Sequence, residues 1–211
     1  MSPIRAVLFD VGGVLTSPIA EAMAESARLA AIDLDSIGPK LWEIFVDENS
    51  ADNPAHALER GEITFDDFAE AAGPIGRDIW AMMHPASPHC MYHLITRAES
   101  MHQFVDEVKT AGYATGIVSN VINEWLELWD AYTRPIDRFD SVVFSCVDAL
   151  RKPSTDIFEL ALSRMGLAPH EALYLDDGPV MVATAQRIGM TAVLVDNHDE
   201  AIVEARRLLA S

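Results

Sequence analysis

The chain has 211 residues, of which 50% are hydrophobic and 23% are charged, and its formal net charge is −18. This length and composition are sufficient for a full hydrophobic core and exclude a disordered protein. The negative charge argues against nucleic acid and anionic membranes as partners, because the long-range field repels both. A small anion can still bind where cations gather, and the lysines are few: Lys40, Lys109 and Lys152.

The two cysteines, Cys90 and Cys146, have no CxxC spacing and predict reduced thiols in a cytoplasmic protein. Asp10 interrupts the first apolar run, which therefore lacks the pattern of a signal peptide. No apolar run is long enough to span a bilayer. The sequence leaves both a monomer and a homodimer open.

Residues 6–9 form an apolar run without alternation, which predicts a strand buried on both faces of a parallel sheet. Further strands are predicted at residues 114–118, 141–144, 172–175 and 191–195. Helical patterns separate these strands. We therefore expect an α/β fold, namely a Rossmann-like parallel five-stranded sheet flanked by helices and joined by right-handed crossovers.

Residues 17–92 differ from the rest because helical fragments are punctuated there by proline and glycine, without a convincing strand. We predict that residues 1–16 and 93–211 form the core and that 17–92 form an inserted all-helical cap. Beyond the insertion, Ser100 and Gln103 predict a capping box at the start of a helix. Within the insertion itself, helical fragments are predicted at residues 20–31, 41–46 and 65–72.

Polar side chains follow the ends of four predicted strands. In chain order these are Asp10, then Ser119 with Asn120, then Lys152, then Asp176 with Asp177. Ligands of open parallel sheets bind beyond the carboxyl ends of the strands, so we expect these side chains to meet at one edge.

This set of residue types favours phosphoryl transfer. Two or three carboxylates without a neighbouring histidine suit Mg²⁺, which prefers oxygen ligands and substrate phosphate. An aspartate such as Asp10 can attack phosphorus and form an aspartyl-phosphate. A lysine together with hydroxyl and amide donors can then stabilise the negative charge of the transferring group.

Four motifs resemble those of the haloacid dehalogenase superfamily of hydrolases, and their order and spacing cover the predicted core. They are Phe9-Asp10-Val11-Gly12-Gly13-Val14-Leu15, Gly116-Ile117-Val118-Ser119-Asn120, Arg151-Lys152-Pro153 and Leu175-Asp176-Asp177. The insertion is similar to the helical cap of this superfamily's first cap class. Its segment 58–64, LERGEIT, resembles a subgroup that contains bacterial sugar-phosphate phosphatases and the N-terminal phosphatase domain of soluble epoxide hydrolases.

The resemblance implies a catalytic role for three residues. Asp10 would be the nucleophile, and Lys152 would neutralise the nucleophile and the phosphate. Ser119, with the amide of Asn120, would hold the phosphoryl oxygens, so that Ser119, Asn120 and Lys152 together would bind the substrate. The cap would close over the site and select the substrate.

The resemblance also implies a magnesium site made by Asp10 and Asp177, with support from Asp176 and with the backbone carbonyl of Gly12 as a further ligand. Gly12 is also where this chain departs from the family pattern. Phosphatases of the family usually carry a second aspartate at this position, which acts as general acid and base. The loss of such a group typically costs about 10²–10⁴-fold in rate.

These observations predict a Mg²⁺-dependent phosphatase that hydrolyses a small phosphorylated metabolite through an aspartyl-phosphate on Asp10. One alternative is a 2-haloacid dehalogenase that uses the same Asp10, since a halide leaving group needs no proton at Gly12. Another is a catalytically weak core that serves as a binding or regulatory module.

Overall fold

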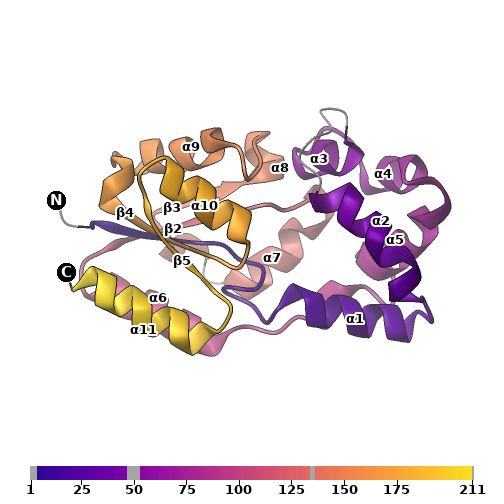
Figure 1. The fold of residues 1–211 in the computed structure, drawn as a ribbon, viewed down its shortest axis with the longest axis horizontal. Coiled ribbons are helices and arrows are strands. Elements are labelled where there is room, and N and C mark those ends of the chain that lie inside the picture. The colour runs from indigo at the N-terminus through magenta and orange to yellow at the C-terminus, as the bar shows by residue number, and fades with distance from the viewer. Residues whose placement is uncertain (1–3, 47–52, 134–135, 211) are drawn as a thin grey trace.

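The computed structural model describes residues 4–46, 53–133 and 136–210. Across these residues, five parallel strands form one sheet in the order β3-β2-β1-β4-β5 (Figure 1). The strands are β1 (Ala6–Phe9), β2 (Ala114–Ser119), β3 (Ser141–Phe144), β4 (Ala172–Asp176) and β5 (Thr191–Leu194). β1 is central, and it pairs with β2 on one side and β4 on the other.

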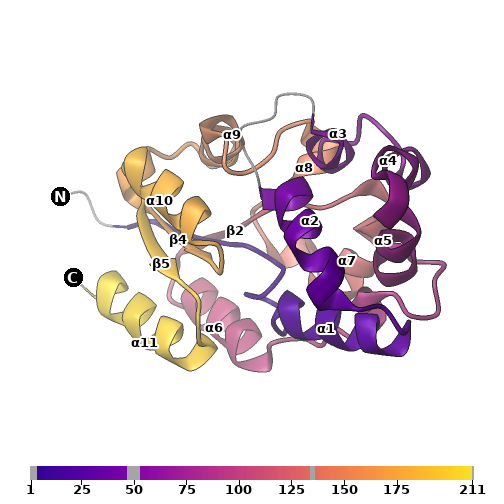
Figure 2. The same ribbon diagram turned by 45° about the vertical axis from the view of Figure 1, so that its right-hand side comes forward.

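Helices cover both faces of this sheet. α6 (Glu99–Thr110) and α11 (His198–Leu209) lie on one face, and α9 (Thr155–Met165) and α10 (Pro179–Arg187) lie on the other (Figures 1 and 2). Val7 and Phe9 of β1 enter one hydrophobic cluster, while Leu8 enters the cluster beneath α9. Burial of both faces explains the lack of alternation in β1, and the predicted fold class is confirmed.

A group of helices lies beyond the carboxyl edge of the sheet, at the end of the molecule opposite the chain termini (Figures 1 and 2). We call residues 17–92 the helical insertion. Its helices are α1 (Ile19–Leu29), α2 (Leu34–Val46), α3 (Pro54–Glu59), α4 (Phe65–Ala71) and α5 (Gly76–Met83). Two helices of the core, α7 (Leu126–Thr133) and α8 (Ser145–Asp148), lie beside the helical insertion. No helix in the described ranges is both long and apolar enough to cross a membrane.

The chain leaves and re-enters the core through two adjacent segments. Thr16 and Arg97 form an isolated antiparallel bridge, and the Ser17 N–H donates to the Thr96 carbonyl oxygen at 2.8 Å. The Ala98 N–H also donates to the Leu15 carbonyl oxygen, at 3.0 Å. These paired segments support our proposal that the insertion is a cap on a core made by residues 1–16 and 93–211.

Two local predictions were wrong. The fragment predicted at residues 41–46 lacks the first turns of α2, because this helix begins at Leu34 and continues through Pro39. The capping box of Ser100 and Gln103 is absent: α6 begins one residue before Ser100, and its N-cap, Ala98, makes no side-chain hydrogen bond. The chain enters α6 directly from the paired segments, so the backbone of Ala98 is already fixed before Ser100 is reached.

Candidate active site

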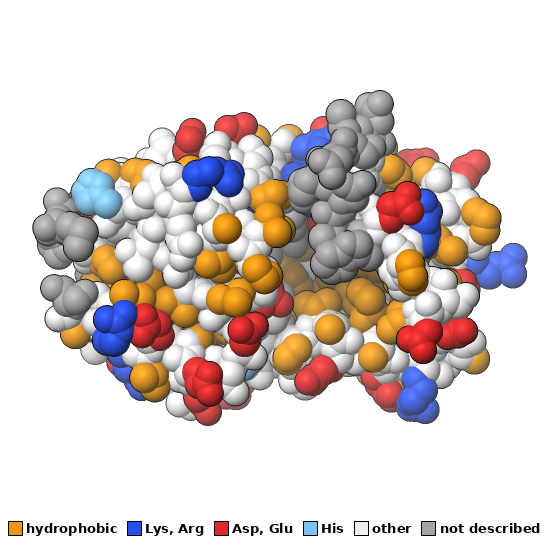
Figure 3. Space-filling model, viewed as in Figure 1, with side chains coloured by type: hydrophobic (Ala, Val, Ile, Leu, Met, Phe, Trp, Pro, Cys, Tyr) orange, Lys and Arg blue, Asp and Glu red, His pale blue; other side chains and the backbone are white. Residues whose placement is uncertain are grey.

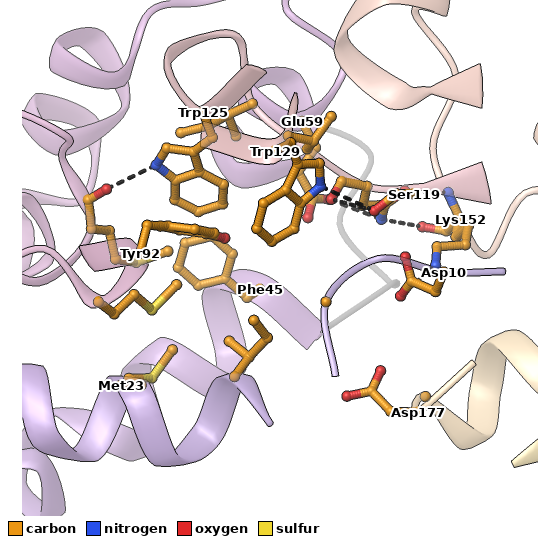
Figure 4. Close-up of a pocket in the computed structure, with 18 of the residues that line it drawn as sticks. Asp10, Met23, Phe45, Glu59, Tyr92, Ser119, Trp125, Trp129, Lys152 and Asp177 are labelled. Carbon is orange, nitrogen blue, oxygen red and sulfur yellow. Dashed lines mark hydrogen bonds and ion pairs between the residues drawn. The ribbon is translucent and has the colours of Figure 1, made fainter. Parts of the chain in front are cut away.

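The polar side chains predicted from the strand ends lie together at one edge of the sheet. Asp10 follows β1, while Ser119 and Asp176 are the last residues of β2 and β4, the two strands next to β1. Lys152 reaches the same place from the loop before α9. Figure 4 shows Asp10, Ser119, Lys152 and Asp177 on one side of a cavity, with Asp177 below Asp10 in this view.

Lys152 is buried between two carboxylates. Its Nζ lies 2.9 Å from Asp10 Oδ2 and 2.6 Å from Asp176 Oδ2, and it donates to the Tyr174 hydroxyl at 3.1 Å. Burial alone lowers the pKa of a lysine, but the two carboxylates outweigh burial and raise the pKa of Lys152 above its ordinary value. Lys152 therefore carries a fixed positive charge beside Asp10.

One carboxylate oxygen of Asp10 accepts a hydrogen bond from the backbone, and the other faces the Lys152 ammonium group. Its Oδ1 accepts from the Val11 N–H at 2.7 Å, and its Oδ2 faces Lys152. Burial raises the pKa of Asp10 to about 6, although the charge of Lys152 opposes the rise. A divalent cation beside Asp10 would favour its ionised form, which is the nucleophilic one.

Three carboxylates are available for such a cation. Asp10, Asp176 and Asp177 have oxygens that all lie within 4.8 Å of one another. Burial, followed by the charges of Asp10 and Asp176, raises the pKa of Asp177 to about 7. Three acids beside one lysine leave an excess of negative charge on hard oxygen ligands, so this donor set fits Mg²⁺.

Two neighbours determine how the acids are arranged. Asp176 accepts hydrogen bonds from Lys152 at Oδ2 and from the Gly178 N–H at Oδ1, which suits a supporting role. Asp177 packs against Gly13, where an added Cβ would lie 2.1 Å from Asp177 Oδ2. Gly13 also has a φ of +71°. A side chain at position 13 would be strained in this backbone conformation and would displace the Asp177 carboxylate, which explains the second glycine of the first motif.

Ser119 and Asn120 have different surroundings. Ser119 is buried, and its Oγ accepts from the Trp129 indole N–H at 3.4 Å. The Asn120 side chain is bonded to the backbone of Lys152: Oδ1 accepts from the Lys152 N–H at 2.8 Å, and Nδ2 donates to its carbonyl at 3.1 Å. The Asn120 side chain therefore positions Lys152, and any contact with a phosphoryl oxygen would fall to the Asn120 backbone.

Sequence reasoning missed two features of the site. Tyr174 donates its hydroxyl to Asp176 and accepts from Lys152, yet in the sequence it is an ordinary strand residue. Glu59, at the end of α3, pairs with Arg151 at 2.7 Å and joins the insertion to the core. Both Glu59 and Arg151 fall inside the quoted motifs, but no sequence pattern showed that they meet.

The surroundings of Gly12 are apolar. A Cβ at this position would lie 3.2 Å from Ile19 Cγ1 and 3.7 Å from Trp129 Cζ2. Gly12 lines the same cavity as Asp10 and Asp177, as its predicted role as a carbonyl ligand requires. A side chain at this position would first have to displace Ile19 slightly.

A cavity of about 560 Å³ extends from these residues into the helical insertion. Its volume lies within the range of sites that bind small molecules. Figure 3 shows hydrophobic side chains in the hollow between the two parts of the molecule. The catalytic candidates lie at one end of this cavity. Side chains from α1, α2 and α7 line much of the rest, together with Met83, Tyr92 and Trp125.

Comparisons with known proteins agree with this arrangement. The family model described as haloacid dehalogenase-like hydrolase matches residues 4–189. Over 97% of its length the chain is 30% identical to acyl-CoA dehydrogenase family member 10 of Mus musculus, of which it spans 19%. It is 25% identical to sesquiterpene phosphatase astK of Aspergillus oryzae, with 97% of this chain and 96% of that protein covered.

A solved structure shows the same fold over the whole chain. A predicted HAD-like family hydrolase from Porphyromonas gingivalis superposes with a TM-score of 0.68 and 27% identity, and 100% of each chain is covered. The helical insertion is therefore included in the likeness.

Proposed function

The chain belongs to the haloacid dehalogenase-like hydrolases, and within this family we propose that it is a Mg²⁺-dependent phosphatase. Its substrate would be a small phosphorylated metabolite, and Asp10 would carry the phosphoryl group. The observation that carries the proposal is the buried Lys152 between Asp10 and Asp176, with an Asp177 oxygen within 4.8 Å of oxygens of both acids.

In the first step an Asp10 oxygen attacks phosphorus, the ester P–O bond breaks, and its electron pair leaves with the alcohol oxygen. In the second step water attacks the phosphorus of the aspartyl-phosphate, so that phosphate is released and Asp10 is regenerated. Lys152 offsets negative charge on Asp10 and on the transferring group, and Ser119 offers a hydroxyl donor. A bound Mg²⁺ would add positive charge beside the phosphoryl oxygens.

The departing oxygen receives no proton from position 12. Gly12 has no side chain, and a Cβ added there would lie nearest to the apolar side chains of Ile19 and Trp129. The site therefore favours alcohols that leave readily as anions, such as phenols, over alcohols of high pKa.

Phosphate release from 4-nitrophenyl phosphate tests the proposal. We expect release with Mg²⁺ and none with a chelator. We expect Asp10→Asn to lower the rate by about 10³-fold or more, because the amide is not a nucleophile. The exposed Asp137→Asn is the matched control and should act like the wild type. Hydrolysis without metal, or full activity of Asp10→Asn, would contradict the proposal.

Dehalogenation is the second candidate, and the apolar surroundings of Gly12 favour it, because a halide leaves without a proton. Asp10 would then attack carbon, but Asp176 and Asp177 would have no metal to hold. Halide release from 2-chloropropionate in the presence of a chelator would establish this activity. Magnesium binding without either activity would favour a binding or regulatory module.

A further inference from the structure

The cavity has one polar end and one apolar end. Asp10, Lys152 and Asp177 lie at the polar end. Figure 4 places Met23, Tyr92 and Trp125 on the side away from Asp10. A ligand whose phosphate contacts Asp10 and Lys152 must therefore extend its other end among hydrophobic side chains.

The two indole N–H groups near the apolar end already have partners. The Trp125 indole N–H donates to the Met83 carbonyl at 2.9 Å, and the Trp129 N–H donates to Ser119 at 3.4 Å. Their rings are left to face the cavity (Figure 4). Glu59 is engaged by Arg151. A sugar would lose the hydration of its hydroxyl groups here and find few replacements, which costs free energy for each group left unpaired.

The charges of the lining also restrict the ligand. Lys152 is the one cation among the described residues that line the cavity, and Asp10 and Asp176 already pair with it. A second phosphate or a carboxylate at the far end of the ligand would meet no positive charge. The chain as a whole is also strongly negative, with a formal charge of −18. The tail of the ligand therefore carries no negative charge.

We propose that the substrate is the phosphate monoester of a hydrophobic alcohol, with its hydrocarbon part held among Met23, Phe45, Tyr92, Trp125 and Trp129. This proposal rests on the phosphatase function and narrows it. Each methylene that moves from water into such a surface contributes about 0.8 kcal/mol, which is about fourfold in affinity. Tail length is then the main determinant of binding.

Binding of a series of n-alkylphosphonates tests this without turnover, since their C–P bond is not hydrolysed. The series runs from methyl to octyl and is measured by calorimetry on the wild-type protein with Mg²⁺, at concentrations below micelle formation. We expect affinity to rise by about fourfold per methylene until the cavity is filled. Affinity that is flat across the series, or stronger for a sugar phosphonate than for octylphosphonate, would overturn the proposal.

Two variants of α1 locate the tail. Met23 lines the cavity and is half-buried, whereas Leu29 on the same helix is 41% exposed. Met23→Lys should abolish most of the dependence on tail length. Leu29→Lys makes the same change of charge outside the cavity and should keep the full dependence. An unchanged dependence in a folded Met23→Lys protein would place the tail elsewhere and defeat the proposal.

Failure of this inference can be told apart from failure of the phosphatase function. If 4-nitrophenyl phosphate is hydrolysed with Mg²⁺ but tail length has no effect on binding, the chain is a phosphatase of another substrate class. If tail length governs phosphonate binding but no phosphate ester is hydrolysed, the apolar subsite stands and the catalytic proposal fails.

Discussion

At the scale of single residues, Gly12 distinguishes this site most clearly. Under the proposed function Lys152, Asp10 and Asp177 would supply charge and a nucleophile, but no side chain at position 12 can protonate the departing oxygen. The obstacle to restoring one is Ile19, whose Cγ1 would lie 3.2 Å from a new Cβ. Ile19 has a movable side chain, so the obstacle can be removed by substitution.

We predict that Gly12→Asp combined with Ile19→Ala extends hydrolysis to alcohols of high pKa. Relative to the wild type, the ratio of kcat/KM for an alkyl phosphate to that for an aryl phosphate should rise by about 10²-fold, because an added acid helps only the poor leaving group. Steady-state rates over phosphates of graded leaving-group pKa measure it. Ile19→Ala alone is the control, and an equal rise in that variant would show that space, not acidity, was the cause.

At the scale of elements, α6 is joined to the first motif through His102. Its Nε2 lies 3.0 Å from the Leu15 carbonyl oxygen, and its Nδ1 lies 2.8 Å from Arg138 Nη2. A neutral ring that donates from Nε2 and accepts at Nδ1 satisfies both contacts. Burial, then the charges of Arg97 and Arg138, lower the pKa of His102 to about 4.

This depressed pKa predicts that His102 makes the fold sensitive to acid. The unfolded chain binds the proton near the ordinary value of 6.5, while the folded protein resists it until about 4. Stability is therefore lost as the pH falls from 6.5 toward 4. Urea unfolding of the wild type and His102→Gln at pH 7.5, 6 and 5 should show that the wild type loses more stability on acidification. A difference between the two proteins that is constant with pH would contradict this.

The elements also show what sequence patterns can and cannot predict. β1 was predicted because a central parallel strand is apolar on both faces, and Asp10 was selected because it ends that strand. The start of α2 was missed because Pro39 resembles a helix breaker, although the helix continues through it. Tyr174 was missed because its role depends on Lys152, which is remote in the sequence and meets it only in the folded chain.

At the scale of the whole molecule, the insertion and the core meet in a buried ion pair. Glu59 and Arg151 lie 2.7 Å apart, and their side chains are 16% and 9% exposed. Asn120 Nδ2, which holds the backbone of Lys152, also lies 3.4 Å from Glu59. The contact that joins the two parts of the molecule is thus close to Lys152, the lysine of the proposed active site.

We predict that Glu59→Gln weakens this junction, because the charge of Arg151 loses its carboxylate partner while it is largely buried. The free energy of unfolding should fall by about 1–3 kcal/mol, and KM should rise more than kcat falls. Glu62→Gln removes the matching acid of an exposed pair with Arg60 and is the control, with little change expected in either quantity. Equal effects of the two substitutions would show that the buried pair has no special role.

The paired segments at Thr16 and Arg97 have an evolutionary consequence. Because the chain departs from the core and returns to it at neighbouring points, the length between them can be replaced without moving any strand of the sheet. Asp10, Ser119, Lys152 and Asp177 all lie outside that length, whereas Met23 and Phe45 lie within it. Under the proposed function, the part that recognises the alcohol is thus exchangeable without any change in the four residues that carry the chemistry.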